Sequence, residues 1–145
     1  MAATGKWYGL AIKSAFNKEI DFDSDTIKVM LCTSTYTPNQ DTHQYKSSVT
    51  NEHGATGTYS AGGATLASKT VSYNSSTNVF SIDAADVTWT GGTWVNVQYA
   101  VIYGSTGTDS TSPLIGYIDF GSAQSFTGDL TLQFDAAGIA TVTVA

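Results

Sequence analysis

Three aspartates at alternate positions are the first residues whose spacing could do chemistry. Asp21, Asp23 and Asp25 have the D-x-D-x-D spacing of an EF-hand calcium loop, in which alternating carboxylates converge on one ion. Such a loop also needs a glycine at its sixth position and a glutamate at its twelfth, where this sequence has Thr26 and Cys32. We therefore interpret the three carboxylates as solvated residues at the entry of a strand, with a weaker cation site as the alternative.

The two histidines are the next candidates. His43 and His53 lie near Asp41 and Glu52, and together these side chains could form a cation site with two histidines and two carboxylates. No short helical or hairpin spacing makes them converge. We expect solvated loop residues here and no metal site.

Motifs for catalysis are missing from the sequence. It contains no G-x-S-x-G nucleophile elbow, no G-x-x-x-x-G-K phosphate loop and no dinucleotide fingerprint. A Ser-His-Asp arrangement would have to be built on the loop that carries both histidines, and nothing singles out a pair of carboxylates for glycoside hydrolysis. We expect no enzymatic activity, no catalytic residue and no cofactor.

Trp89 and Trp94 bracket the sequence TGGT. Exposed aromatic residues on a β-sandwich can stack on sugar rings, whereas aromatic cross-strand pairs clamp the ends of paired strands. We favour the clamping role, and sugar binding is the alternative.

The composition is that of one globular, β-rich domain. The chain has 145 residues, enough to bury a core without disulfides, and residues 1–145 show no change of composition that would mark a boundary. Hydrophobic residues make up 41% and charged residues only 12%, while 22 Thr and 16 Ser supply the polarity. Threonine favours strands and serine favours turns, so an all-β chain is indicated.

The charge and the single cysteine exclude several classes of partner and site. A net charge of −6 without any arginine argues against nucleic-acid binding, because cationic contacts to phosphates dominate that affinity. Cys32 is alone, so we interpret it as a small packing residue. No basic-then-apolar leader follows Met1 and no 18-residue apolar run occurs. We expect synthesis in the host cytoplasm and no membrane partner.

One amphipathic helix is predicted near the N-terminus, over residues 6–18. Its apolar stripe has the spacing of one helix face, with Thr4 as a possible N-cap, and comprises Tyr8, Ala11, Ile12, Ala15 and Phe16. The helix should cover a sheet. A buried strand follows in TIKVMLCT, residues 26–33, and then turn chemistry prevails over residues 34–63. A segment of this length is commonly mobile or functional, and it could form an arm over a neighbouring subunit.

Strand signals recur at short intervals after residue 63. The pattern predicts about seven or eight strands separated by turns at NSST, TGGT and DAAG, the last one closing a hairpin, over 64–73, 78–83, 87–89, 94–103, 112–120, 129–134 and 138–144. With the N-terminal helix, this indicates a mainly β chain folded as an antiparallel β-sandwich, jelly-roll-like or Ig-like.

Several phrases, taken together, resemble a family of small virion structural proteins of tailed bacteriophages and prophages. They cover most of the chain in order: KWYGLAIKSAF, DTIKVMLCTSTYTPNQDTH, VTNE, TGTYSAGGATLASKTVSY, DVTW, YAVIY, TSPLIGYIDFG and DAAGIATVTVA. The resemblance implies a structural role in the phage particle, without catalytic residues or a cofactor. It transfers no functional residue.

Charge favours the outside of the head, because phosphate repulsion opposes an acidic, arginine-free protein in the DNA-filled interior. We therefore expect a head decoration or cement protein that binds the major capsid protein or another virion protein, as a homo-oligomer. The alternatives are a tail or fibre component that contacts the host surface and a carbohydrate-binding module. Tyrosine offers a large contact area at modest entropic cost, and the predicted protein-contact residues are Trp7, Tyr36, Pro38, His43, Tyr45 and Tyr59.

Overall fold

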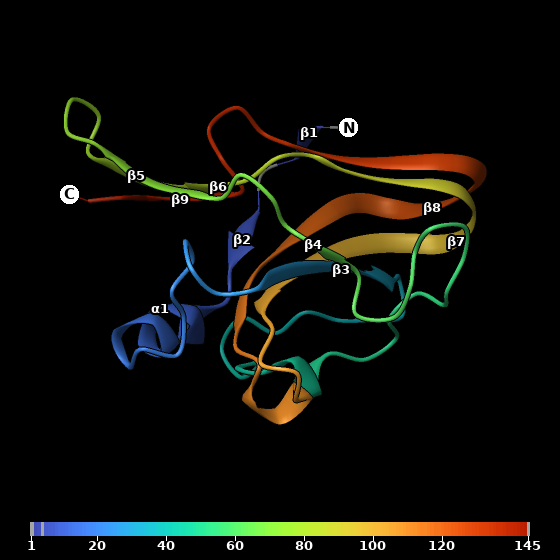
Figure 1. The fold of residues 1–145 in the computed structure, drawn as a ribbon, viewed down its shortest axis with the longest axis horizontal. Coiled ribbons are helices and arrows are strands. Elements are labelled where there is room, and N and C mark those ends of the chain that lie inside the picture. The colour runs from blue at the N-terminus through green and yellow to red at the C-terminus, as the bar shows by residue number, and fades with distance from the viewer. Residues whose placement is uncertain (1, 4, 145) are drawn as a thin grey trace.

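The computed structural model describes residues 2, 3 and 5–144, and these form nine strands, one α-helix and two 3-10 helices. In chain order the elements are β1 (Ala2–Ala3), β2 (Lys6–Trp7), α1 (Gly9–Phe16), β3 (Ile27–Thr33), η1 (Lys46–Ser48), β4 (Ala64–Thr65), β5 (Thr70–Asn74), β6 (Val79–Asp83), β7 (Val87–Gly104), η2 (Asp109–Thr111), β8 (Leu114–Phe134) and β9 (Ala140–Thr143). This architecture confirms the predicted mainly β fold with one N-terminal helix (Figure 1).

The larger sheet has six strands. Its order is β1-β8-β7-β3-β4, and β2 also pairs with β8. Only β1 runs parallel to its partner among the described pairs. The long strands β7 and β8 pair from Val87 opposite Leu132 to Tyr103 opposite Leu114. Figure 1 shows this two-stranded ribbon curving back at the right-hand edge, so that its two halves face each other across the core.

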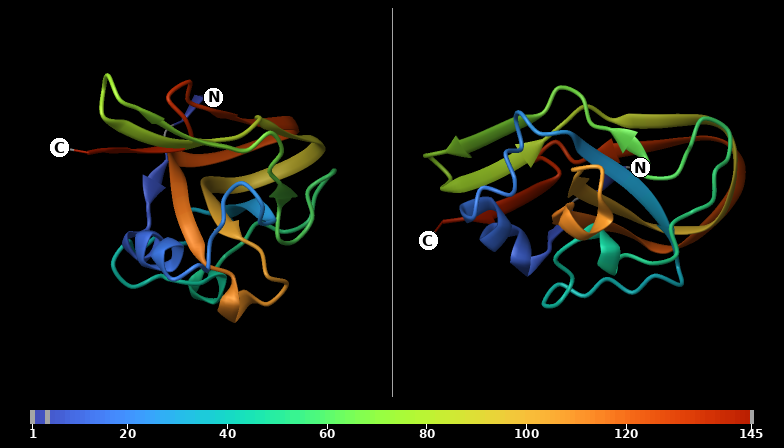
Figure 2. Two further views of the ribbon diagram at one scale, coloured as in Figure 1. Left: turned by 60° about the vertical axis from the view of Figure 1, so that its left-hand side comes forward. Right: turned by 60° about the horizontal axis from the view of Figure 1, so that its bottom comes forward.

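The smaller sheet has three antiparallel strands in the order β5-β6-β9. In both views of Figure 2 it extends from one end of the molecule, on the same side as α1. The predicted turn at NSST is confirmed, because β5 and β6 pair from Thr70 opposite Asp83 to Asn74 opposite Val79. The single strand predicted over 64–73 is wrong, because its two ends form β4 of the large sheet and β5 of the small one.

Two apolar cores lie on opposite faces of β3. Ile27, Val29 and Leu31 belong to the first, between the two layers of the sandwich, whereas Met30 and Cys32 belong to the second. The second core is closed by α1 and by residues of the 34–63 segment. The strand is thus buried on both faces, as its near-continuous apolar run predicts.

The 34–63 segment lies against the body of the protein. Its backbone pairs with the sheet at Cys32–Glu52 and with the 105–113 connection at Tyr45–Pro113, and the side chains of Tyr36 and Tyr59 are buried in the two cores. Most of its other residues are exposed, as the sequence predicts. In this structure the segment covers its own chain, so the interpretation as an arm that reaches a neighbour finds no support in its conformation.

The helix is shorter than the predicted 6–18. Residues 6 and 7 form β2 instead, opposite Tyr117 and Gly116, because their backbone hydrogen bonds to a neighbouring strand replace those of a first helical turn. Tyr8 is the N-cap residue and makes no side-chain capping bond, while Lys18 has a positive φ of 63° just after the helix end. The possible cap Thr4 lies outside the described residues.

One predicted turn and one predicted break between strands are wrong. TGGT, residues 90–93, lies within β7 and the stretch 121–128 lies within β8, so each long strand replaces two predicted ones. The register shifts between Trp89 and Gly92 and again between Trp94 and Val97. Gly91 has a φ of +66°, which suits a glycine bulge. Such bulges bend a strand without ending it, which is why glycine and threonine here mark the curvature of the ribbon.

The predicted C-terminal hairpin is also wrong. Gly138 does have the expected positive φ, 112°, but the turn carries the chain into the other sheet. There β9 pairs with β6, with Ser81 opposite Thr141. β9 does not pair with β8, the strand before it in sequence. It pairs with β6, because this pairing places the apolar residues of β9 beside those of β6 on one face of the small sheet.

Candidate functional site

An apolar groove lies between α1 and the three-stranded sheet. It has a volume of about 920 Å³. The helix contributes Ala11, Ile12, Ala15 and Phe16 to one wall. Among the described residues, Lys18 and Asp21 are the only charged side chains that line it.

The opposite wall is one face of the small sheet. Alternate residues of a strand point to the same face, and on each of the three strands the alternate residues that line the groove are apolar: Val71, Tyr73, Phe80, Ile82, Val142 and Val144. The other face is polar and carries Ser72, whose hydroxyl is 2.8 Å from that of Ser81. The sheet is therefore amphipathic, and its apolar face is only partly covered.

Exposure separates this groove from the rest of the surface. Seven large hydrophobic side chains are exposed among the described residues, and five of them line the groove: Ile12, Phe16, Val71, Tyr73 and Val144. Phe16 is 87% exposed and Tyr73 is 53% exposed. A contiguous exposed apolar patch of this kind is typical of an interaction site.

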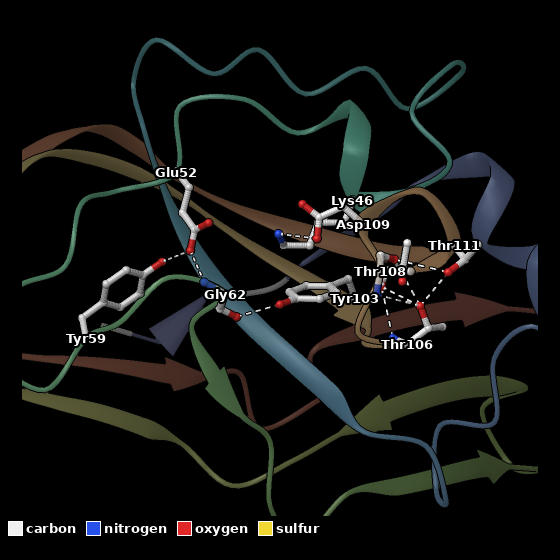
Figure 3. A network of polar contacts seen from close by, with 10 residues as sticks. Lys46, Glu52, Tyr59, Gly62, Tyr103, Thr106, Thr108, Asp109 and Thr111 are labelled. Atoms are coloured by element: carbon white, nitrogen blue, oxygen red, sulfur yellow. Dashed lines mark hydrogen bonds and ion pairs between the residues drawn. The ribbon is translucent and has the colours of Figure 1, made fainter.

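A second, smaller pocket is polar. It has a volume of about 240 Å³ and lies between the 34–63 segment and the 105–112 connection (Figure 3). At its wall the Glu52 carboxylate accepts hydrogen bonds from the Tyr59 hydroxyl, at 2.9 Å, and from the Gly62 backbone N–H, at 2.5 Å. The Tyr103 hydroxyl donates to the Gly62 carbonyl at 2.8 Å.

The rest of this polar network joins the two loops. The ammonium group of Lys46 is 2.8 Å from a carboxylate oxygen of Asp109 and lies 5.8 Å from the centre of the Tyr103 ring. Within the 105–113 connection, the hydroxyl of Thr106 hydrogen-bonds those of Thr111 and Ser112. Figure 3 shows that the Lys46–Asp109 ion pair ties the 34–63 segment to the 105–113 connection and that the Tyr103–Gly62 hydrogen bond ties it to β7.

Tyr103, which lines this pocket, and Tyr59, which donates to Glu52 at its wall, act as stable hydrogen-bond donors. Burial is the main cause that raises the pKa of Tyr59 and of Tyr103, and the nearby Glu52 carboxylate raises both further. Their hydroxyls therefore stay protonated at neutral pH. A protonated tyrosine beside a carboxylate gives a fixed hydrogen bond, and the arrangement is a structural tie between loops.

The predicted contact residues differ in how deeply they are buried. Tyr36 and Tyr59 are buried, with 1% and 2% of their surface exposed, so their side chains serve the two cores and are not available to a partner in this conformation. Pro38, His43 and Tyr45 are half-buried in the 34–63 segment.

Trp7 is the one predicted contact residue that lines the apolar groove. Its indole Nε1–H donates to the Thr141 carbonyl at 2.9 Å, and its ring lies 6.2 Å from that of Phe80. These contacts link β2 to the small sheet and form the floor between the two walls.

His43 ends a chain of hydroxyl groups. The Tyr8 and Tyr36 hydroxyl oxygens are 2.7 Å apart, and the Tyr36 hydroxyl is 3.0 Å from His43 Nδ1. The backbone N–H of Asn39 also points at Nδ1, at 3.4 Å, which makes this nitrogen an acceptor. Burial lowers the pKa of His43, so the neutral ring is favoured.

The two histidines do not converge. His53 accepts a hydrogen bond at Nε2 from the Val95 backbone N–H and lies with Nδ1 2.7 Å from the Gly54 carbonyl. It packs on the Trp94 ring, with centroids 5.5 Å apart. Among the described residues, no three His, Cys, Asp or Glu side chains gather as a metal site would require.

The three aspartates after α1 form a local turn. The Asp25 carboxylate accepts from the Asp21 backbone N–H at 2.7 Å, and the Asp21 carboxylate accepts from that of Ser24 at 3.2 Å. Hydrogen bonds from Ser24 lower the pKa of Asp21. Cys32 is buried, and burial raises the pKa of its thiol to about 12, so it is a packing residue.

The tryptophans belong to the first core. Trp89 and Trp94 are 3% and 1% exposed and their ring centroids lie 6.4 Å apart. Tyr59 packs edge-on against both rings. Stacking of either tryptophan on a sugar would require it to leave the core, so their role is to pack the bend of the ribbon.

Comparisons of this chain with protein-family models, with curated proteins and with solved structures find no match. Within the described part of the chain, the helices are too short or too polar to cross a bilayer.

Sequence reasoning missed most of the groove. A signal was present, because TVSY and TVTV each alternate hydroxyl-bearing and apolar residues over four positions, and FSI does so over three, without any charge. This alternation predicts the strands themselves but not which strands pair. Only the pairing of β9 with β6 places the three apolar faces side by side.

Proposed function

We propose that this chain is a structural protein of a tailed-phage particle, a decoration protein that docks on the outer surface of the head. The observation that carries the proposal is the apolar groove between α1 and the three-stranded sheet. Its expected occupant is an apolar, uncharged segment of the major capsid protein, because in the part of the chain that the structure describes only two charged side chains, Lys18 and Asp21, line the groove.

Three further features support this role. The sequence resembles small virion structural proteins over most of its length. The surface is acidic and has no arginine, which suits the outside of a DNA-filled shell. The 34–63 segment is tied to the sheet by the polar network, so the protein presents a preformed surface and loses little conformational freedom on docking.

The mechanism is binding linkage. A protein that binds the mature shell better than its precursor or its dissociated subunits stabilises that shell by mass action. Burial of a fully exposed phenylalanine contributes on the order of 2 kcal/mol, so the exposed side chains of Phe16 and Tyr73 are sufficient to dominate such an attachment.

The test is occupancy of purified particles by variant proteins. Phe16→Ser and Tyr73→Ser should each lower occupancy at least tenfold, while Val95→Ser, an exposed apolar residue outside the groove, should leave it unchanged. Equal occupancy for all three variants would contradict a role of the groove. Labelled protein that attaches to the tail would contradict the head assignment and support a tail component.

A further inference from the structure

We propose that two copies of this chain pair through strand β5, antiparallel about Ser72, to form one continuous six-stranded sheet. The inference rests on the edge of the small sheet and does not depend on which particle or surface the protein binds.

Strand β5 is an open edge. It pairs with β6 on one side and with no strand of the described residues on the other, and all five of its side chains are exposed. An unpaired edge presents a row of backbone N–H and C=O groups that another strand can satisfy. The unpaired backbone N–H and C=O groups of β5 therefore favour an extended strand as their partner.

The other edge of the same sheet is already occupied in part. The Thr141 carbonyl of β9 accepts the Trp7 indole N–H, and the Ile139 carbonyl just before β9 accepts the Gly5 backbone N–H. The N-terminal segment thus covers this side of the sheet. Among the described residues, β5 is the edge that remains accessible.

The edge lacks the features that keep proteins from pairing through their strands. Charged residues, proline and bulges usually protect an edge. No charged residue and no proline occurs from Thr70 to Ile82, and the register of β5 with β6 is regular over all five pairs. For a chain with a net charge of −6, this uncharged stretch lets two copies approach without direct repulsion between carboxylates.

The sequence of β5 is complementary to itself. When two TVSYN strands pair antiparallel about Ser72, Val71 of each copy lies opposite Tyr73 of the other on the apolar face. Aromatic residues opposite β-branched residues are favourable cross-strand pairs. Thr70 and Asn74 face each other on the polar side, so no polar residue is forced onto the apolar face.

The two-fold axis of such a pair is perpendicular to the sheet, so both apolar faces lie on the same side. Val71 and Tyr73 line the groove of their own chain. Pairing therefore places two grooves next to each other, facing one way. A dimer of this kind would present twice the apolar surface to whatever the groove binds.

Charge placed at the axis provides the test. In Ser72→Lys, two like charges stand directly opposite each other across the axis, so sedimentation equilibrium should give the mass of one chain. The unchanged protein and Ser72→Ala should give twice that mass. Ser72→Ala is the matched control because it also removes the hydrogen bond to Ser81. An equal mixture of Ser72→Lys and Ser72→Glu should recover the doubled mass.

Disulfide trapping gives a second measurement. Directly opposed residues of antiparallel strands have Cα atoms about 4.5–5.5 Å apart, within reach of a disulfide. Under oxidation Ser72→Cys should form a covalent dimer, and Ser76→Cys, in the hairpin loop, should not. The single native thiol of Cys32 is buried and does not compete.

A single-chain mass for the unchanged protein at all concentrations would overturn the proposal, as would a doubled mass for folded Ser72→Lys. The groove variant Phe16→Ser should remain a dimer, because Phe16 lies on α1. A failure of β5 pairing and a failure of attachment through the groove can therefore be observed separately.

Discussion

The two sheets of this protein treat their apolar residues in opposite ways. In the large sheet, β3 and the second half of β7 are buried on both faces by two cores. In the small sheet, one face is apolar but Val71 and Tyr73 remain exposed, opposite the exposed Phe16 of α1. The hydrophobic residues of the large sheet are buried and stabilise the fold. The small sheet keeps part of its apolar surface in contact with water. That difference is our reason for proposing the small sheet as part of the interaction site.

The 34–63 segment explains why the large sheet can be buried on both faces. This segment supplies Tyr36 to one core and Tyr59 to the other, and the polar network of Glu52, Lys46 and Asp109 fixes its backbone. No comparable segment covers the small sheet among the described residues. The contrast predicts large effects on folding for changes in the first region and small ones in the second.

The largest effect is expected for Trp94→Ala. Trp94 is 1% exposed, packs on Tyr59, His53 and Trp89, and donates its indole N–H to the Gly128 carbonyl at 2.9 Å. Loss of a buried tryptophan costs about 3–5 kcal/mol of unfolding free energy. Urea denaturation measures this change. Val95→Ala, at the exposed neighbouring position, is the control and should change stability by less than about 0.5 kcal/mol.

A smaller loss is expected for Tyr59→Phe. The Tyr59 hydroxyl donates to Glu52 and accepts the Leu31 backbone N–H at 3.0 Å. Its removal leaves a buried N–H without this partner, at a cost of about 1–3 kcal/mol. Tyr73→Phe, which removes an exposed hydroxyl, is the matched control. Equal denaturation midpoints for the two variants would show that the polar network does not secure the segment.

Protonation of His43 should destabilise the fold modestly. Burial lowers the pKa of His43 below its ordinary value of 6.5, so the unfolded chain binds this proton more readily than the folded one. The His43 contribution to stability is therefore present above pH 6.5 and declines as pH falls below that value. Urea midpoints measured from pH 8 to about pH 5 should show this step in the unchanged protein and a shallower curve in His43→Gln. Parallel curves would contradict the assignment.

The smallest effect on folding is expected for Phe16→Ser. Phe16 is 87% exposed, and a surface substitution of this kind changes the unfolding free energy by less than about 0.5 kcal/mol. Thermal unfolding of Phe16→Ser beside that of Ile102→Ser, a fully buried change in the large sheet, measures the contrast between the two regions. A large loss of stability for Phe16→Ser would mean that the groove supports the fold.

The sequence predicted the elements better than their connections. The strand at 26–33 follows from one near-continuous apolar run, and the hairpin around NSST from local turn chemistry. The error at TGGT arises because Gly91 has a positive φ, which occurs in bulges as well as in turns. At the C-terminus the turn with Gly138 at a positive φ does form, and only the partner of β9 was predicted wrongly. Which strand β9 joins depends on distant apolar faces, and local patterns do not contain that information.

The site was predictable only in part. Trp7 was singled out and does line the groove, whereas Tyr36 and Tyr59 were predicted as contact residues and are buried. Aromatic residues in a polar segment look alike in sequence whether they point outward or anchor the segment to a core. Burial decides between the two, and it depends on how the segment folds back on the sheet.

Electron cryo-microscopy of the intact, washed phage particle tests the central claim most directly. We expect density for this chain on the outer surface of the head, with α1 and the three-stranded sheet turned toward the shell and an apolar segment of the capsid protein between them. A chain that is missing from washed particles, or whose groove faces solvent while another surface makes the contact, would contradict the claim.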